Sequence, residues 1–488
     1  MAGLGDLLRR MSHYTLANLA NMAAGFVSFP ILTRVLSVAE YGIMGLIVML
    51  LNFVNSVAKL GLQHSSVRLF PEWENREGGR EQFVFTIFIA ALLVCVPVTA
   101  LYDGAVLALR PWLSGRLFYF MLLSSPMILL NAMNSFGQNL LRARQWSGPR
   151  AIFEVTTTYA AMILAVLGAA RVIGGLRGYY LGLMLGQALV AGVLVVYVLR
   201  WTRFRRGNWS SPALREALVF GLPMALFELC GVLVYLGDRT IIQWLLDEEA
   251  VGYYTVAFNL ANYVNLLFSI PLDMAAVPMY THIYEKEGAA ATSDFLRKTA
   301  RFVFLFALPV LAGMVVIRED IVALLASKRF LPGADLLHIL LAAFLITGLR
   351  SLFAAGMFLR RRPWQMAGLE VGCAVLNSIL CLVLIPRFGI LGAAYATLVS
   401  QTLTTITCWA LGSRLVRARV DLLPLFLHAA CAAAMGIAIH YIDPGPGVVR
   451  LLLRLGAGVA IYGVLVLVVD GEARALVAKI ARRTKGAE

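Results

Sequence analysis

The chain has 488 residues, of which 60% are hydrophobic and only 14% are charged. A soluble globular domain carries about a quarter charged residues, so this composition excludes an ordinary water-soluble protein and indicates one that folds in lipid. The net charge of +15 is spread over many short connections. This dispersal argues against a basic nucleic-acid-binding face, and we expect no nucleic-acid partner.

The apolar residues fall into blocks of about 20 residues, the length of a helix that crosses a hydrocarbon core roughly 30 Å thick. Backbone polar groups in lipid must be hydrogen-bonded within the segment, so each block is expected to be helical. The sequence therefore predicts an all-α integral membrane protein with about fourteen transmembrane helices. In chain order, these are 12–35, 41–63, 82–103, 116–141, 151–171, 176–199, 214–238, 250–273, 299–318, 334–358, 364–386, 389–412, 421–440 and 451–470.

Lys and Arg gather on alternate connections, a bias that marks the cytoplasmic side. We therefore expect both termini to be cytoplasmic. The first apolar block is long and rich in Asn and Ser, which favours a retained helix over a cleaved signal segment. The predicted inner clusters are Arg142/Arg144/Arg150, Arg203/Arg205/Arg206, Arg360/Arg361/Arg362, Arg414/Arg417/Arg419 and Lys479/Arg482/Arg483/Lys485.

Two patterns recur about 210 residues apart. Gly42 and Gly252 are each followed ten residues later by an Asn-aromatic-Val-Asn run, and Gly175, Gly178 and Gln187 recur as Gly389, Gly392 and Gln401. The offset covers six spans, an even number, so the two halves are expected to have parallel orientations. The predicted domains are a six-helix bundle over 1–206, a second over 207–413, and a two-helix hairpin with a basic cytoplasmic tail over 414–488.

Polar side chains recur at helical spacing inside several spans. Asn52, Asn55, Lys59 and Gln63 share one face of the second span, and Asn262 belongs to a similar stripe in the eighth. The first span adds Asn18, Asn21 and Ser28, and the fourth adds Asn131, Asn134, Gln138 and Asn139. Such residues either line a polar cavity or hydrogen-bond between neighbouring helices.

Ionisable residues within spans point more strongly to function, because a charge at mid-membrane costs about 2.5–3.5 kcal/mol on insertion scales. Glu154 has a structural explanation, since it can pair with Arg150 near a helix start. Glu228 follows Pro223, where a helix bends, and is our candidate for binding a proton or cation. Lys59, Asp273, Arg350 and Glu370 either form internal ion pairs, such as Lys59 with Asp273, or line a cavity.

Residues for catalysis or metal binding are not grouped in the sequence. The six histidines are scattered singly, and the six cysteines (Cys95, Cys230, Cys373, Cys381, Cys408 and Cys431) lie in apolar blocks without metal-ligand spacing. There is also no phosphate-binding loop. We therefore expect no enzyme activity, no cofactor and no metal, and we expect energy to come from an ion gradient, the membrane potential or consumption of the product.

Three segments resemble one transporter family. Residues 32–42 (LTRVLSVAEYG), with Gly61-Leu62-Gln63 and Val67-Arg68, are similar to the polysaccharide-transporter branch of the multidrug/oligosaccharidyl-lipid/polysaccharide flippase superfamily. Residues 238–242 and 250–257 resemble the counterpart in its second half, and 389–394 resemble the start of its twelfth helix. The resemblance implies two six-helix halves around a central cavity lined by the first, second, seventh and eighth helices.

The resemblance also implies a function. The expected protein is a flippase of the bacterial inner membrane that moves polyprenyl-pyrophosphate-linked oligosaccharides to the outer leaflet by alternating access, for O-antigen or exopolysaccharide synthesis. Expected partners are the lipid-linked oligosaccharide, membrane lipids, H⁺ or Na⁺, and polysaccharide polymerase machinery. The candidate substrate-binding residues are Arg34, Asn52, Asn55, Lys59, Arg68, Asn262 and Arg350, and those for ion coupling or internal pairing are Glu228, Asp273 and Glu370.

Other functions stay open at this point. The same fold can carry a peptidoglycan lipid precursor, or drugs exchanged for protons or sodium. A membrane glycan polymerase or ligase is a further alternative, although such enzymes need catalytic groups gathered at one membrane face and usually a large outer loop. The connections here are about 25 residues or shorter, which is typical of linkers.

Overall fold

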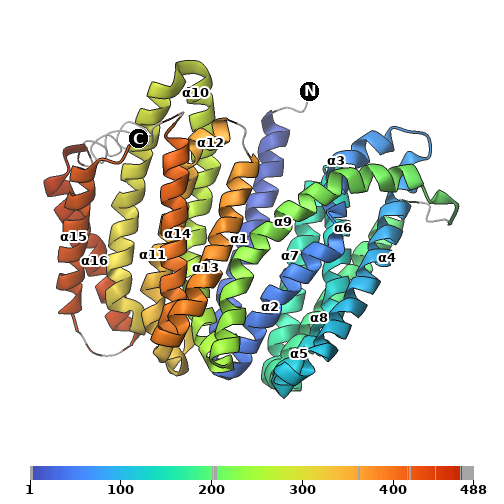
Figure 1. Ribbon diagram of the computed structural model, residues 1–488, viewed down its shortest axis with the longest axis horizontal. Helices are drawn as coiled ribbons and strands as arrows, with labels where there is room; N and C mark the ends of the chain where they lie inside the picture. Colours follow the sequence, from blue (N-terminus) through green and yellow to red (C-terminus); the bar gives the residue numbers. More distant parts are fainter. Residues whose placement is uncertain are drawn as a thin grey trace. The chain divides into compact units, whose positions relative to one another are not determined.

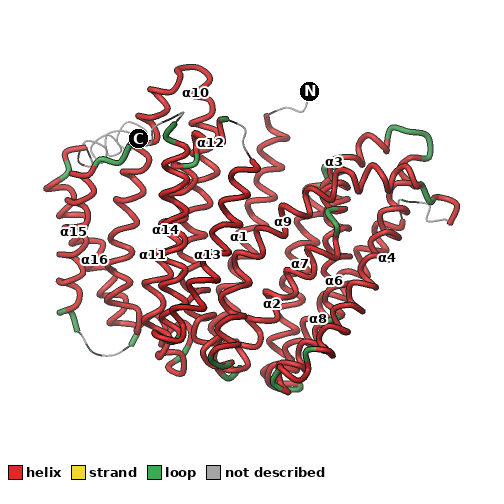
Figure 2. The backbone as a smooth tube through the Cα atoms, in the orientation of Figure 1, coloured by secondary structure: helices red, strands yellow, loops and turns green. Residues whose placement is uncertain are grey.

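The computed structural model describes residues 4–200, 202, 206–360, 363–414, 416, 419–443, 445, 447–472 and 474. Helices make up nearly all of this part of the chain, and it contains no strand (Figure 2). The predicted all-α class is confirmed. The predicted basic tail beyond residue 474 lies outside the described residues, as do Arg203, Arg205, Arg361, Arg362 and Arg417 of the predicted inner clusters.

The helices form two compact units, coloured blue to green and yellow to red in Figure 1. The first unit comprises residues 1–243 and 247–252, and the second comprises 244–246 and 253–488. Helix α9, which the predicted domains assign to the second half, therefore belongs to the first unit by its contacts. The proposed duplication concerns the ancestry of the two halves and remains a prediction.

The first unit is built from nine helices within the described residues. Short 3₁₀ or π turns join some of them, at Arg110–Trp112, Gly168–Val172 and Arg206–Asn208. The helices are α1 (Leu4–Val35), α2 (Val38–Lys59), α3 (Leu62–Glu74), α4 (Gly79–Ala108), α5 (Gly115–Ser124), α6 (Pro126–Ala143), α7 (Ser147–Leu167), α8 (Gly175–Arg200) and α9 (Ser211–Leu245).

The second unit begins with a very long helical segment and continues with six further helices in the described part of the chain. A π turn at Val322–Ala326 and a 3₁₀ turn at Lys328–Gly333 follow the long segment. The helices are α10 (Glu248–Ile321), α11 (Ala334–Phe353), α12 (Ala355–Leu359), α13 (Pro363–Phe388), α14 (Ile390–Gly412), α15 (Leu422–His440) and α16 (Val448–Val469).

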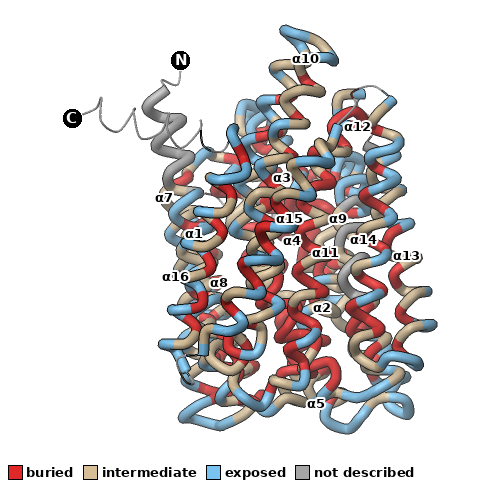
Figure 3. The backbone as a smooth tube through the Cα atoms, turned by 90° about the vertical axis from the view of Figure 1, so that its left-hand side faces the viewer, coloured by how far each residue is buried: buried red, intermediate tan, exposed pale blue. Residues whose placement is uncertain are grey.

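Helix α10 is two helical arms joined at a sharp reversal. Gly288 has φ 81°, a left-handed conformation that breaks the helix and favours glycine. Figure 1 shows α10 turning back on itself, and Figure 3 shows that this turn carries few buried residues. The arms, residues 248–287 and 289–321, contain the predicted spans 250–273 and 299–318.

Every predicted span overlaps one helix or two consecutive helices. Eleven helical stretches in the described residues are long and apolar enough to cross a membrane, and α10 is counted once among them. Two predicted spans outside that set, 214–238 and 389–412, lie in α9 and α14. The chain is therefore a multi-pass membrane protein.

Residues 32–42, one of the segments that resemble the transporter family, cap a helix and allow close helix packing. The Ser37 hydroxyl accepts from the Glu40 N–H, and the Glu40 carboxylate accepts from the Ser37 N–H at 2.9 Å, forming a capping box. Glu40 also accepts from the Leu176 N–H at 3.1 Å, so one carboxylate caps the starts of α2 and α8. A Cβ at Gly42 would overlap the Glu248 carbonyl, so the glycine allows α2 and the start of α10 to touch.

The C-terminal hairpin of α15 and α16 is attached to the second arm of α10 at both ends. At one end, Asp320 pairs with Arg454 at 2.9 Å and also with Arg450. At the other end, Asp470 pairs with Arg301 at 2.5 Å and lies 2.9 Å from His428. Between these clusters lies an almost wholly apolar cavity of about 660 Å³. Buried ion pairs of this kind fix where a helix docks, because breaking one leaves an uncompensated charge.

Candidate functional site

The candidate site lies where α2 gives way to α3. Leu60 and Gly61 have φ of 46° and 72°, so two consecutive left-handed residues interrupt the helix. Gly61 is needed for a second reason: a Cβ there would overlap the Gly221 backbone of α9. The interruption places Lys59, at the end of α2, beside Gln63 and His64, at the start of α3.

Helix α9 is held against this interruption by small side chains. Ser65 donates to the Ala217 carbonyl at 2.5 Å, and Gly221 packs on Gly61. Further along α3, the Trp73 indole donates to Glu216 at 2.8 Å. Residues 217 and 221 are four residues apart, and residues 221 and 228 are seven apart. These spacings are about one and two helical turns, so all three residues lie on one face of α9. Glu228 therefore points at the junction of α2 and α3.

Four donors converge on the Glu228 carboxylate. Ser56 and Lys59 donate to Oε1 at 3.2 and 2.8 Å, while Gln63 donates to Oε2 at 2.8 Å and His64 Nε2 lies 3.2 Å from the same oxygen. We call these five residues the Glu228 cluster. Ser56 and Gln63 are buried. The side chains of Lys59, Glu228 and His64 are 17%, 26% and 45% exposed, so the charged part of the cluster is only partly shielded.

The electrostatics of this arrangement are those of an anion site. A carboxylate that accepts from an ammonium group and three neutral or ionisable donors is strongly stabilised, because charge-assisted hydrogen bonds are about twice as strong as neutral ones. Lys59 is at the same time neutralised by Glu228, so neither charge is isolated in the membrane-spanning bundle. Sequence reasoning suggested Asp273 as a partner for Lys59, whereas the structure pairs Lys59 with Glu228.

A second charged cluster lies in the other unit and has an arginine at its centre. Arg350 of α11 is 8% exposed and donates to Glu370 of α13 at 2.5 Å and to the Gln401 carbonyl oxygen of α14. The guanidinium thus joins three helices. Two further hydrogen bonds support the same region: Ser400 donates to Asn377 at 3.3 Å, and the Tyr254 and Thr397 hydroxyls lie 3.2 Å apart.

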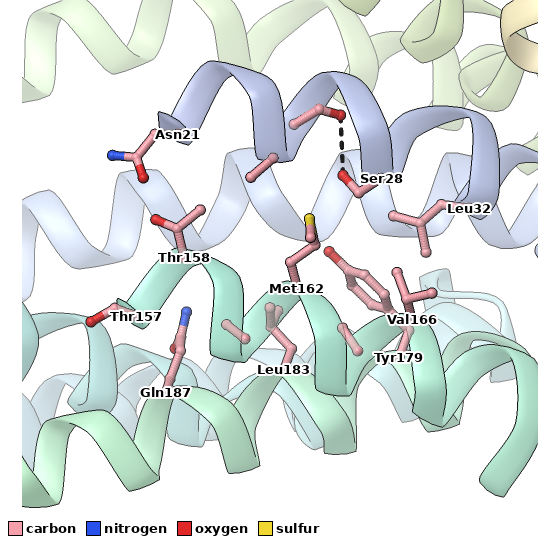
Figure 4. Close-up of a pocket in the computed structure, with 14 residues that line it drawn as sticks. Asn21, Ser28, Leu32, Thr157, Thr158, Met162, Val166, Tyr179, Leu183 and Gln187 are labelled. Atoms are coloured by element: carbon pink, nitrogen blue, oxygen red, sulfur yellow. Dashed lines mark hydrogen bonds between the residues drawn. The ribbon is translucent and has the colours of Figure 1, made fainter. Parts of the chain in front are cut away.

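A cavity of about 340 Å³, lined by both polar and apolar side chains, lies between α1, α7 and α8 in the first unit (Figure 4). Asn21 and Ser28 line one side, and Thr158, Tyr179 and Gln187 line the other. Asn21 donates to Glu154 at 3.2 Å, and Glu154 pairs with Arg150 at 3.4 Å. The predicted Arg150–Glu154 pair is thus confirmed. Of the polar stripe of the first span, Asn21 and Ser28 face this cavity, whereas Asn18 is exposed.

The remaining predicted site residues do not join either charged cluster within the described contacts. Arg34 is exposed and donates to the Pro30 carbonyl at 2.7 Å, and Arg68 pairs with Glu72 one turn further along α3. Asn52 is exposed and Asn55 is buried. Asn262 accepts from Asn265 at 3.4 Å along α10. Asp273 is exposed and has no ion pair among the described residues.

Sequence reasoning missed three members of the two clusters. Ser56 was not singled out, His64 is one of the six histidines described as scattered singly, and Gln401 appears only as part of the repeat. The signal that would have found His64 is Gly61: an interruption at that residue rotates the next turn, so spacing along an unbroken helix no longer tells which side chains share a face.

The matches to known proteins agree with this architecture. Residues 31–335, more than half of the chain, match the sequence profile of the family described as polysaccharide biosynthesis protein. The chain belongs to this family. The match covers α2 to α10 in full, and so includes the whole Glu228 cluster. The predicted resemblance to the polysaccharide-transporter branch is confirmed.

Two curated relatives of this family member come from the archaeon Haloferax volcanii. The probable low-salt glycan biosynthesis flippase Agl15 is 25% identical over 169 residues, which are 35% of this chain and 36% of the relative. The probable flippase AglR is 24% identical over 258 residues, which are 51% of this chain and 53% of the relative. The chain thus spans about a third and about half of the length of these relatives.

Solved structures with the same fold are membrane transporters. The lipid II flippase MurJ in an inward closed conformation superposes with a TM-score of 0.76 over 96% of this chain and 100% of its own, at 13% identity. An inward-facing multidrug-resistance MATE transporter of the MOP superfamily gives a TM-score of 0.66 over 82% of this chain and 94% of its own, at 14% identity. At these identities the likeness establishes the fold.

Proposed function

We propose that this protein is a flippase that moves a polyprenyl-diphosphate-linked oligosaccharide across the bacterial inner membrane by alternating access. The observation that supports this most is the Glu228 cluster, which brings an ammonium group and three further donors together inside a multi-pass bundle of the polysaccharide biosynthesis family. Its chemistry suits a phosphate-bearing head group, because phosphate oxygens need charge-assisted hydrogen bonds.

The flippase relatives and the fold support the same proposal. Agl15 and AglR carry names that describe probable flippases, one of them in glycan biosynthesis. The role proposed for Lys59 is to bind the diphosphate, with Arg34, Asn52, Asn55 and Asn262 as further proposed contacts around the substrate. Arg68 and Arg350, which the sequence also offered as substrate contacts, are instead proposed to have structural roles, in the pair with Glu72 and in the junction of α11, α13 and α14. The glycan feeds O-antigen or exopolysaccharide assembly in this proposal, with polymerase machinery downstream and both termini in the cytoplasm.

A peptidoglycan lipid precursor is the second candidate cargo. The superposition on the lipid II flippase favours it, because it extends over nearly the whole of both chains. Both cargoes carry a diphosphate on a polyprenyl chain, so they make the same demand on the Glu228 cluster and differ only in the sugar. A multidrug antiporter is a weaker candidate, since Lys59 and His64 suit an anion better than a cationic drug.

The experiment that tests the proposal is deletion of the gene with analysis of lipid-linked glycans. We expect loss of surface polysaccharide and accumulation of the lipid-linked repeat unit at the cytoplasmic leaflet. Complementation by the wild-type gene restores export. Normal surface polysaccharide without precursor accumulation contradicts the proposal, and a block in peptidoglycan synthesis instead identifies the second cargo.

Ion coupling is proposed at Glu228, with Asp273 and Glu370 as further proposed sites for H⁺ or Na⁺. Moving one charge across 100 mV is worth about 2.3 kcal/mol, enough to bias a two-state carrier more than tenfold. Protonation of Glu228 would release Lys59 and so assist the loading of substrate. Glu228→Gln is expected to flatten the pH dependence of transport, and an unchanged pH profile in this variant argues against the coupling role.

A further inference from the structure

The four donors around Glu228 form a complete anion site whose occupant is part of the same chain. Each carboxylate oxygen accepts two contacts, at 2.8 and 3.2 Å on Oε1 and at 2.8 and 3.2 Å on Oε2. Two contacts per oxygen are what a substrate phosphate oxygen would also accept. A contact with Lys59 alone would leave most of the roughly four acceptor positions of the carboxylate unfilled.

The cluster is partly accessible, which distinguishes it from a fully buried structural ion pair. Its neutral donors, Ser56 and Gln63, are buried, with exposed fractions of 3% and 4%, so they form the inner side of the site. The three ionisable groups above them are each at least 17% exposed. A ligand can therefore reach the ammonium and imidazole groups from the exposed side, and the Glu228 side chain has room to leave.

The donors and the acid belong to different structural elements. Ser56 and Lys59 end α2, Gln63 and His64 begin α3, and the Gly61 interruption fixes these four donors relative to one another. Glu228 reaches the site from α9, five residues after Pro223. The donor set thus stays assembled when Glu228 withdraws.

We propose that the Glu228 carboxylate is an internal substitute for the anionic group of the substrate, which displaces it from Ser56, Lys59, Gln63 and His64 on binding. The ligand chemistry is an anionic oxygen group, either the diphosphate of the lipid carrier or a carboxylate of the glycan. In the absence of substrate, Glu228 keeps Lys59 neutralised in the membrane. This inference rests on the proposed function and adds a competition between an acid of the protein and the substrate.

The competition has a measurable consequence for affinity. When a site is free for only a fraction of the time, the apparent dissociation constant rises by the inverse of that fraction. If Glu228 occupies the donors about nine-tenths of the time, its removal tightens anion binding about tenfold. An ordinary structural pair behaves in the opposite way, because loss of Glu228 would disturb the site and weaken binding.

The test is calorimetric titration of the full-length protein in lipid nanodiscs with inorganic diphosphate and, separately, with glucuronate. We expect Glu228→Gln to bind diphosphate about tenfold more tightly than wild type, and Glu228→Gln combined with Lys59→Met to lose this gain. Tighter binding of glucuronate in place of diphosphate identifies a sugar carboxylate as the anion. Unchanged or weaker binding of both probes in Glu228→Gln overturns the proposal.

The matched control is Glu216→Gln, which removes another acid of α9 that contacts α3 but lies outside the cluster. It is expected to leave both affinities at the wild-type value. An equal gain in Glu216→Gln would mean that the loss of any negative charge on α9 suffices, and would contradict competition at the cluster.

A readout on wild-type protein covers the case in which Glu228→Gln does not fold. The chain has only six lysines, Lys59, Lys286, Lys298, Lys328, Lys479 and Lys485, so ¹³C-methylated lysine signals can be assigned one by one. Diphosphate is expected to shift the Lys59 signal selectively, and a Lys59 signal that stays fixed while diphosphate binds overturns the inference. The proposed function fails separately, when deletion of the gene leaves glycan export and precursor levels unchanged.

Discussion

Each of the two charged clusters pairs an ionisable side chain inside a membrane-spanning unit, but the two arrange their charges in opposite ways. In the first unit an acid, Glu228, lies at the centre of four donors, while in the second unit an arginine, Arg350, lies at the centre of two acceptors, Glu370 and Gln401. Arg350 is 8% exposed, whereas the Lys59, Glu228 and His64 side chains are between 17% and 45% exposed. The arginine itself is shielded, although its partner Glu370 is 41% exposed, whereas each charged group of the acid cluster is partly open.

This difference separates a fixed structural ion pair from a site that can exchange partners. A buried guanidinium cannot lose its proton and is costly to leave unpaired, so Arg350 should keep its partners throughout any cycle. A partly hydrated carboxylate and ammonium can separate at lower cost, because water and substrate can replace the lost contacts. We therefore expect stability to depend more on Arg350 and transport to depend more on Lys59.

The largest expected effect is at Gly61, which positions the open cluster. Gly61→Ala requires a left-handed alanine and overlaps the Gly221 backbone, so the free energy of unfolding should fall by about 3 kcal/mol. Gly192→Ala in α8 is the matched control, because a Cβ there meets nothing within 4 Å. Thermal unfolding in detergent should show a loss of stability for Gly61→Ala, and little change or a small gain of stability for Gly192→Ala. Equal stabilities would show that the close approach of α3 and α9 is not needed.

The next effect is at Arg350. Arg350→Met leaves the Glu370 carboxylate and the Gln401 side-chain oxygen without their donor, at a cost of about 2–3 kcal/mol, below the usual range for a fully buried pair because the Glu370 side chain is 41% exposed. Arg68→Met is the control, since its pair with Glu72 is exposed and worth about 0–1 kcal/mol. The measurement is the same unfolding experiment on both variants. Similar losses of unfolding free energy in the two variants would show that the Arg350 ion pair stabilises the fold no more than an exposed surface pair does.

Lys59→Met should affect stability less and transport more. The Glu228 carboxylate keeps three other partners and some hydration, so we expect a loss of about 1 kcal/mol in the free energy of unfolding. Glycan export per inserted molecule should fall by at least about tenfold, the equivalent of one charge-assisted hydrogen bond. Lys59→Arg keeps the charge and should retain more export than Lys59→Met. Full export by Lys59→Met would remove this residue from the site.

The smallest effect is expected at Glu154, whose partner Asn21 lines the cavity between α1, α7 and α8. Its pair with Arg150 joins neighbouring turns of one helix and is worth about 0.2–0.5 kcal/mol. Glu154→Gln retains a side chain that can accept from Asn21, so stability and export should both stay close to wild type. A large loss of export with normal stability would make the cavity a second functional site.

The sequence was sufficient to predict the helices but not their side-chain contacts. Blocks of about 20 apolar residues define spans directly, because lipid imposes one element length and one type of hydrogen bonding. The matched glycines of the repeat also have a physical counterpart. Gly175 and Gly389 both have φ of 58°, and Gly178 and Gly392 both lie against the backbone of a neighbouring helix. Such positions are recognisable because only glycine fits them.

Partner choice among the buried charges was not predictable from the sequence. Periodicity placed Lys59 on a polar face, but its partner depends on how α9 crosses the α2–α3 interruption, which involves residues about 170 positions away in the chain. From the sequence, Asp273 was named as an example of a partner for Lys59, and Glu228 was assigned to binding a proton or cation. Glu40 and Gly42, both in the segment 32–42 that resembles the family, have structural roles, in helix capping and in close helix packing.

The most direct test of flippase activity at the Glu228 cluster is a transport assay in proteoliposomes. A fluorescent lipid-linked oligosaccharide is reconstituted with wild-type protein, Lys59→Met or Arg68→Met at equal protein content, and its exposure to an added quencher is followed over time. The account predicts rapid transfer between leaflets with wild type and with Arg68→Met, and transfer at least about tenfold slower with Lys59→Met. Equal rates with and without wild-type protein, or an unimpaired Lys59→Met, would contradict it.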